Sequence, residues 1–136
     1  MIKDRLYEYY IYQDYNCAES LLHAVNDEYN LGILEEAFKI VGGFGAGMGC
    51  GKTCGALCSG VSAIGQIKII ERAHVTRDLK ECCAKYVEAF IKELGSDQCD
   101  TLVKIYKNQE TRCLDTIFKA ADILDSQLMK IIKEAE

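Results

Sequence analysis

Apolar residues recur at intervals of three and four along most of this 136-residue chain. The sequence contains no proline, and no sustained alternation of apolar and polar residues indicates a half-buried strand. Residues three and four positions apart share one face of an α-helix, so this spacing is typical of helices that bury one side. The pattern predicts an all-α fold. A hydrophobic content of 49% in a chain of this length is sufficient for one domain with its own core.

Capping residues and glycines divide the chain into about six to seven expected helices. Asn16 and Glu19 have the spacing of a capping box, which predicts a helix over 17–29. The other helices are expected over 4–13, 34–41, 51–70, 76–94, 97–106 and 112–134, the last three capped by Thr76, Ser96 and Thr111. We expect residues 1–136 to form a single compact domain around the Gly- and Cys-rich helix over 51–70.

Charge and hydropathy limit the partners and the compartment. The net charge is -5 and the isoelectric point is near 5.1, so we expect no nucleic-acid partner. No uncharged run reaches the roughly 20 apolar residues of a membrane span. The N-terminal sequence MIKDRLYEYYIYQDY places charges where a signal peptide has an apolar core, so we expect a cytoplasmic protein. Eight cysteines in a reducing compartment point to metal binding or redox chemistry rather than to structural disulfides.

The segment AGMGCGKT at 46–53 fits a permissive phosphate-loop pattern in which Ala replaces the first Gly. A phosphate loop follows a strand in a βαβ unit, whereas residues 34–41 have the pattern of a helix. We therefore expect no nucleotide binding. The sequence also contains no recognisable Ser/His/Asp or Cys/His arrangement, so a hydrolase is not expected.

Four cysteines fall at the starts of four expected helices. Helix N-termini carry a partial positive charge and free amide donors, both of which favour a thiolate over a thiol. This placement predicts lowered pKa values, with a further contribution from the neighbouring Lys52 and Arg112, as a metal ligand or redox nucleophile requires. The expected ligands or redox residues are Cys17, Cys54, Cys99 and Cys113.

Two further cysteines and two glycines accompany Cys54 in the glycine-rich segment. Cys50 and Cys58 are secondary candidates, because they share a face with Cys54 if the helix extends back to residue 50. If Cys50 lies in a loop instead, it is free to turn toward a cluster. Gly51 and Gly55 begin a stripe of small residues that allows a neighbouring backbone to approach closely.

The remaining cysteines and the histidines have patterns typical of structural residues. Cys82 and Cys83 point about 100° apart on a helix, so they cannot face one site together. Cys83 falls on the apolar stripe and Cys82 at its edge. His23 and His74 lack ligand-type spacing to any cysteine, and we expect each to be exposed or hydrogen-bonded.

Four segments together resemble the C_GCAxxG_C_C family of redox-active cysteine proteins. They are NCAES at 16–20, GGFGAGMGCGKTCGAL at 42–57, LGSDQC at 94–99 and RCLDTIFKAADIL at 112–124. The resemblance covers nearly the whole chain and implies that Cys17, Cys54, Cys99 and Cys113 are the functional positions.

The chain departs from the family pattern in two ways. Ser59, followed by Gly60, stands where the motif has Gly, and we expect packing to survive because a small residue is kept. Cys50, Cys58, Cys82 and Cys83 are extra to the pattern, so no family role is carried over to them. The family is similar to the non-haem part of split-Soret cytochromes, which implies an iron-sulfur site, although this chain has no C-x-x-C-H haem attachment.

Three hypotheses remain open from the sequence. The four cysteines bind an iron-sulfur cluster, or zinc, for electron transfer or sensing. Alternatively, they form a metal-free thiol-disulfide redox protein or sensor. In the third hypothesis the chain is a helical interaction domain with incidental cysteines. No pattern identifies a redox partner, and a homodimer is compatible with broad apolar helix faces.

Overall fold

The architecture is built from helices alone, which confirms the expected all-α class. The computed structural model describes all 136 residues and contains no strand. Its α-helices are α1 (Cys17–Tyr29), α2 (Gly55–Lys68), α3 (Leu79–Leu94), α4 (Cys99–Tyr106) and α5 (Leu114–Ala135). Shorter segments of 3-10 or π helix are η1 (Ile2–Arg5), η2 (Glu8–Tyr12), η3 (Glu35–Phe44), η4 (Gly47–Gly51) and η5 (Ala73–Val75). No helix is long and apolar enough to cross a lipid bilayer.

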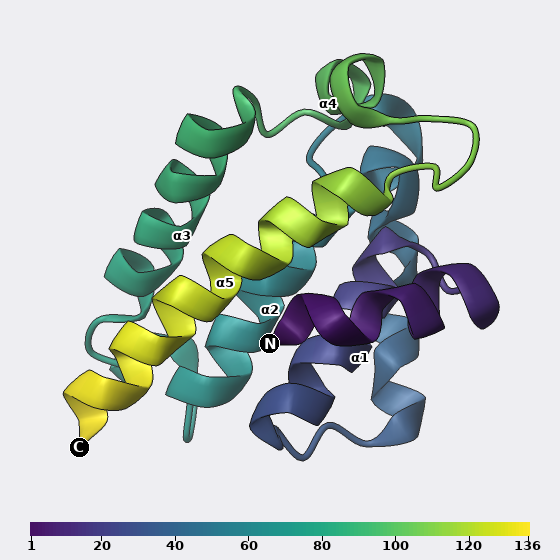
Figure 1. The fold of residues 1–136 in the computed structure, drawn as a ribbon. Coiled ribbons are helices and arrows are strands. Elements are labelled where there is room, and N and C mark those ends of the chain that lie inside the picture. Colours follow the sequence, from purple (N-terminus) through teal and green to yellow (C-terminus); the bar gives the residue numbers. More distant parts are fainter.

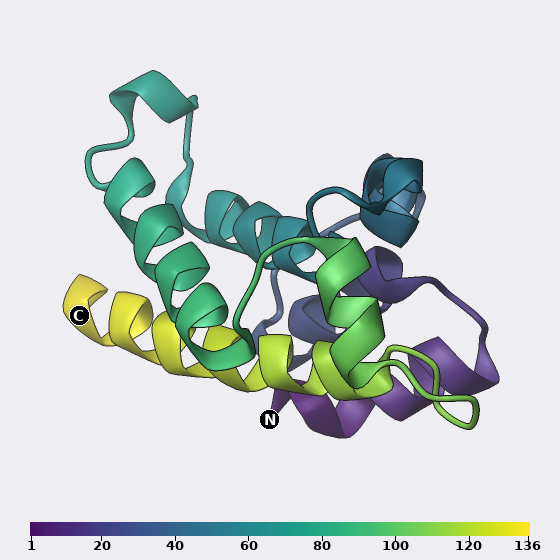
Figure 2. The same ribbon diagram turned by 90° about the horizontal axis from the view of Figure 1, so that it is seen from above.

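Helix α2 lies at the centre, as the sequence predicts, and packs against α1, α3 and α5. Figure 1 shows α5 crossing in front of α2 with α3 beside it, and Figure 2 shows α4 beside the first turns of α5. Small residues on α2 allow this close packing. A side chain at Gly60 would enter the ring of Tyr86, and the buried Ser59 hydroxyl donates to the carbonyl oxygen of Ala18 at 2.5 Å. Serine at position 59 is thus accommodated by a hydrogen bond to α1.

The start of α1 follows the predicted capping box. The Asn16 side chain accepts the backbone N–H of Glu19 at 3.0 Å, and the Glu19 carboxylate accepts the N–H of Asn16 at 3.1 Å. The Asn16 amide also donates to the carbonyl oxygen of Gly42 at 2.8 Å. These bonds fix the first turn of α1, including Cys17, against the glycine-rich segment.

The other three predicted caps are wrong, because each hydroxyl bonds within a loop instead. Thr76 donates to the carbonyl oxygen of Arg72, and α3 begins only at Leu79. Ser96 accepts the N–H of Gln98, the residue that precedes α4. Thr111 bonds to Asn108 in the turn before α5. Each of these helices therefore begins two or three residues later than its predicted start.

The glycine-rich segment also differs from the prediction. Segment η3 continues to Phe44, beyond the predicted end at residue 41, and α2 begins at Gly55 rather than at residue 51. Between them the backbone makes a left-handed turn, with φ of 56° at Ala46, 61° at Gly47 and 60° at Met48. Six glycines in residues 42–51 make such a path accessible, and helix propensity does not predict it.

The N-terminal segment is helical, as expected over 4–13, and it covers one side of the helices. Leu6 and Tyr10 are buried, whereas Tyr12 is 72% exposed. The buried Asp125 carboxylate accepts the N–H of Ile2 at 3.0 Å and so attaches this segment to α5. Tyr10 is thereby held beneath the start of α5, next to the site described below.

Candidate functional site

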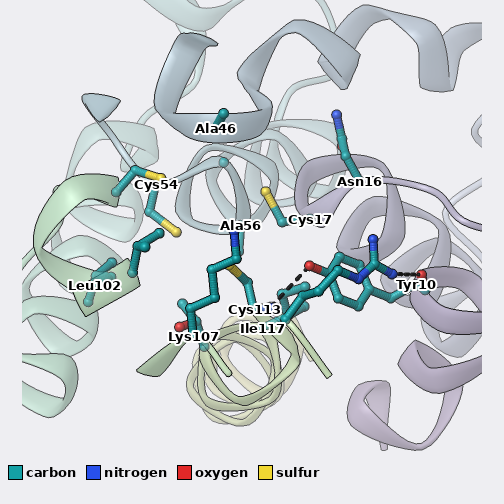
Figure 3. Close-up of a pocket in the computed structure, with 15 residues that line it drawn as sticks. Tyr10, Asn16, Cys17, Ala46, Cys54, Ala56, Leu102, Lys107, Cys113 and Ile117 are labelled. Carbon is teal, nitrogen blue, oxygen red and sulfur yellow. Dashed lines mark hydrogen bonds between the residues drawn. The ribbon is translucent and has the colours of Figure 1, made fainter. Parts of the chain in front are cut away.

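The four cysteines picked out by their predicted helix starts come together in the structure. Cys17 is the first residue of α1, Cys99 is the first of α4, and Cys54 and Cys113 immediately precede α2 and α5. All four line one cavity of about 280 Å³ (Figure 3). They are free thiols, as are the other four cysteines.

Two short backbone contacts hold Cys54 and Cys99 beside each other. The N–H of Cys54 donates to the carbonyl oxygen of Asp97 at 2.8 Å, and the N–H of Cys99 donates to that of Lys52 at 2.6 Å. Thr53 and Gln98 form an isolated antiparallel bridge between these bonds. The start of α2 is thus fixed to the start of α4, although the two are far apart in the sequence.

Glycine brings the Cys17 sulfur to the start of α2. A Cβ atom at Gly55 would lie 2.8 Å from Cys17 Sγ and 2.8 Å from the carbonyl oxygen of Phe44. Both distances are too short for a larger residue without a shift of its neighbours, so the close approach expected at Gly55 is made by the backbone of Phe44 and by the Cys17 sulfur. Gly51, in contrast, faces the carboxylate of Asp100 and has φ of 74°.

The thiols are more basic than their helix starts predict. Burial, together with negative charge at Cys54 and Cys113, raises the pKa of Cys17 to about 12. Burial raises the pKa of Cys54 to about 11, and burial with charge at Cys113 also raises that of Cys99. The expectation of lowered pKa values is therefore wrong for these three residues, because desolvation in the cavity outweighs the helix termini.

The helix starts still act on the sulfurs. The N–H groups of Ala56 and Leu57 bond to Cys54, and the N–H of Ala18 bonds to Cys17, and these bonds favour the thiolate. Arg112 lines the cavity, as does Lys107, which reaches toward it in Figure 3, whereas Lys52 does not. The site can therefore stabilise negative sulfur once a positive centre compensates the cost of burial.

Tyr10 also lines the cavity, although no sequence motif identifies it as a site residue. Its hydroxyl accepts the N–H of Cys113 at 3.2 Å. No spacing in the sequence relates Tyr10 to Cys113, which lies 103 positions later. The attachment of the N-terminal segment to α5, and contacts of Arg112 with Tyr10, place the two together.

Cys50 and Cys58 do not line the cavity. Cys50 is exposed in η4, with its thiol 3.7 Å from the carbonyl oxygen of Gly47, and so does not share a helix face with Cys54. Cys58 is half-buried on α2. On α3 the expected order is reversed, since Cys82 is buried and Cys83 only half-buried.

The two histidines differ from each other. His74 is exposed, as expected. His23 is buried, with its ring stacked 3.7 Å from that of Phe38, and its Nε2 has no hydrogen-bond partner. The expectation of an exposed or hydrogen-bonded His23 is therefore wrong, and burial lowers its pKa.

The cysteines surround the cavity rather than converge on one point. No three side chains among His, Cys, Asp and Glu are grouped closely enough to hold a single metal ion. The arrangement offers four sulfur donors, three nearby backbone N–H groups and a largely apolar lining.

Comparison with known protein families gives a match over most of the chain. A family described as "Putative redox-active protein (C_GCAxxG_C_C)" matches residues 15–127, a range that contains all four cavity cysteines. Neither a search of curated proteins nor a search of solved structures returned a match.

Proposed function

Because the chain belongs to the C_GCAxxG_C_C family, we propose that its four cavity cysteines bind an iron-sulfur cluster and that the protein transfers or senses electrons. The observation that carries this proposal is the convergence of four helix starts, each with one cysteine, on one cavity of about 280 Å³. The ligands are Cys17, Cys54, Cys99 and Cys113.

The donor set fits a cluster. Iron-sulfur clusters are commonly held by four cysteine thiolates. In a tetrahedral zinc site each sulfur lies about 2.3 Å from the ion, so the sulfurs lie within roughly 4 Å of one another. Here the four side chains line a larger space, which favours a cluster over a single zinc ion.

Burial and backbone N–H groups determine the protonation and the charge of the ligand sulfurs. Burial keeps Cys17 and Cys54 protonated near neutral pH, and both thiols would have to lose their protons to hold a cluster as thiolates. The N–H groups of Ala18, Ala56 and Leu57 then bond to negative sulfur. When bound, the cluster supplies one-electron transfer, and hydrogen bonds and limited solvent access set its potential.

Anaerobic reconstitution tests the proposal. The protein should gain broad visible absorption that dithionite bleaches and a mild oxidant restores. Replacing Cys17, Cys54, Cys99 or Cys113 by Ser should each reduce this absorption strongly. Cys50→Ser is the matched control, since Cys50 lies in the same glycine-rich segment outside the cavity, and it should behave as the native protein. Equal loss in the control, or no absorption in the native protein, would contradict the proposal.

A metal-free thiol-disulfide protein is the second candidate. Cys17 packs against Gly55, the neighbour of Cys54, and a charge at Cys54 raises the pKa of Cys17. These two thiols would lose two protons and two electrons to an external disulfide, which is reduced to two thiols. Their high pKa values leave little thiolate at neutral pH. Because the thiolate is the reacting form, disulfide exchange at these two cysteines should be slow. Thiol counting and mass mapping after mild oxidation should reveal one specific pair if this candidate is correct.

A further inference from the structure

Tyr10 lies inside the cavity wall with its hydroxyl beside the cysteines. The side chain is only 5% exposed, and its ring comes from the N-terminal segment η2. Figure 3 shows the hydroxyl next to Cys113 and on the side of the cavity that Cys17 occupies. The N–H of Cys113 donates to this oxygen at 3.2 Å.

The proton of the Tyr10 hydroxyl has no acceptor among the structure's hydrogen bonds, although the hydroxyl lies in the cavity that Cys17 and Cys113 line. A tyrosine hydroxyl accepts and also donates one hydrogen bond. The hydroxyl oxygen accepts from Cys113, and none of the structure's hydrogen bonds gives its proton an oxygen acceptor. Burial raises the pKa of Tyr10, and negative charge at Cys113 and Cys17 contributes to the increase. A phenol with its ordinary pKa of about 10 keeps its proton near neutral pH, so the Tyr10 hydroxyl is a hydrogen-bond donor in the wall of the cavity.

Arg112 fixes the orientation of this phenol. Its guanidinium lies 4.4 Å from the centre of the Tyr10 ring, and its Nη2 donates to the backbone carbonyl oxygen of Tyr10 at 2.9 Å. A second nitrogen, Nη1, lies 3.5 Å from the Asp14 carboxylate. Arg112 itself has φ of 55°, so the turn before α5 directs its side chain back toward Tyr10.

We propose that the Tyr10 hydroxyl donates a hydrogen bond to a thiolate sulfur of Cys113 or Cys17 and thereby raises the reduction potential of the site. The inference rests on the proposed function, since it assigns a residue that regulates the same sulfurs. A hydrogen bond to a ligand sulfur withdraws negative charge, which stabilises the reduced state more than the oxidised state. Arg112 acts as the positioning residue for Tyr10.

Comparison of Tyr10→Phe with Tyr9→Phe tests this assignment. Both substitutions remove one hydroxyl from the same segment, but the Tyr9 hydroxyl bonds to Asp27 and does not line the cavity. In a redox titration of the reconstituted protein, Tyr10→Phe should shift the midpoint potential to more negative values. Tyr9→Phe should leave it unchanged. An unchanged potential in Tyr10→Phe, or an equal shift in both variants, would overturn the proposal.

A second variant covers the case in which Tyr10→Phe does not fold. Arg112→Lys keeps the charge but loses the planar group that stacks on Tyr10 and bonds its carbonyl oxygen. It should shift the potential in the same direction by a smaller amount, and no shift would overturn the proposal.

The failure of the proposed function is distinguishable from the failure of this inference. If the native protein binds no iron and sulfide, the cluster proposal fails. The potential of its thiol-disulfide couple, measured by equilibration with glutathione, then decides the role of Tyr10. Tyr10→Phe should again be more negative than the native protein and Tyr9→Phe, and equal values would contradict the inference.

Discussion

Replacing Gly55 by Ala should destabilise the protein and disturb the site together. The added Cβ would lie 2.8 Å from both Cys17 Sγ and the carbonyl oxygen of Phe44. One of these neighbours belongs to the backbone, so rotation of a side chain cannot relieve the whole clash. Overpacking of this kind costs about 1–3 kcal/mol. Alanine gains at most about 1 kcal/mol over glycine in a helix, so the net loss is about 0–3 kcal/mol.

Gly65→Ala on the same helix is the matched control. Its added Cβ would lie 3.8 Å from Ile69 Cδ1, which is an ordinary contact. This variant gains helix propensity without a clash and should be stabilised by up to about 1 kcal/mol. Because both variants share the propensity gain, the difference between them isolates the clash, which should be about 1–3 kcal/mol.

Urea unfolding of the reduced, metal-free proteins measures this difference. Gly55→Ala should have the lower free energy of unfolding, and after anaerobic reconstitution it should also bind less iron than Gly65→Ala. If Gly55→Ala were as stable as Gly65→Ala and bound as much iron, the close approach of Cys17 to α2 would be refuted.

Three other perturbations have defined outcomes. The reduced, metal-free protein should be most stable below about pH 8.5, the ordinary thiol pKa. It should lose stability as pH rises toward the pKa values of about 11 for Cys54 and about 12 for Cys17. Urea midpoints at pH 8 and 10.5 measure this loss, and an equal loss in Cys17→Ala would argue against its assignment to Cys17. Asn16→Ala should cost about 1 kcal/mol in unfolding free energy through loss of the α1 cap, whereas Asn108→Ala, in an exposed turn, is the control and should cost less. Removing iron with a chelator under reducing conditions should lower the unfolding temperature, because a group bound only by the folded state stabilises it; an unchanged temperature would contradict binding to the folded state.

The helical fold and the grouping of the cysteines could be predicted from local signals. The spacing of apolar residues predicted the fold class, and the capping box at Asn16 and Glu19 predicted the first residue of α1 correctly. The starts of α3, α4 and α5 could not be placed in this way, because serine and threonine bond equally well inside loops. At Thr76 and Thr111 the loop bond was the one formed.

The chemistry of the site depends on contacts that local patterns do not contain. A cysteine at a helix start predicts a lowered pKa, but the burial of Cys17 and Cys54 follows from the meeting of four distant helices. The same holds for Tyr10, whose approach to Cys113 depends on the attachment of η1 to α5 through Asp125. The buried, unpartnered His23 depends likewise on the later segment η3, which supplies Phe38.

Iron and acid-labile sulfide per chain, measured in protein prepared without oxygen, test the central claim most directly. A cluster held by the four cavity cysteines predicts both elements in a fixed ratio in the native protein and in Cys50→Ser. It also predicts their loss in Cys17→Ser, Cys54→Ser, Cys99→Ser and Cys113→Ser. Native protein that contains neither element, and takes up neither on reconstitution, would contradict the claim.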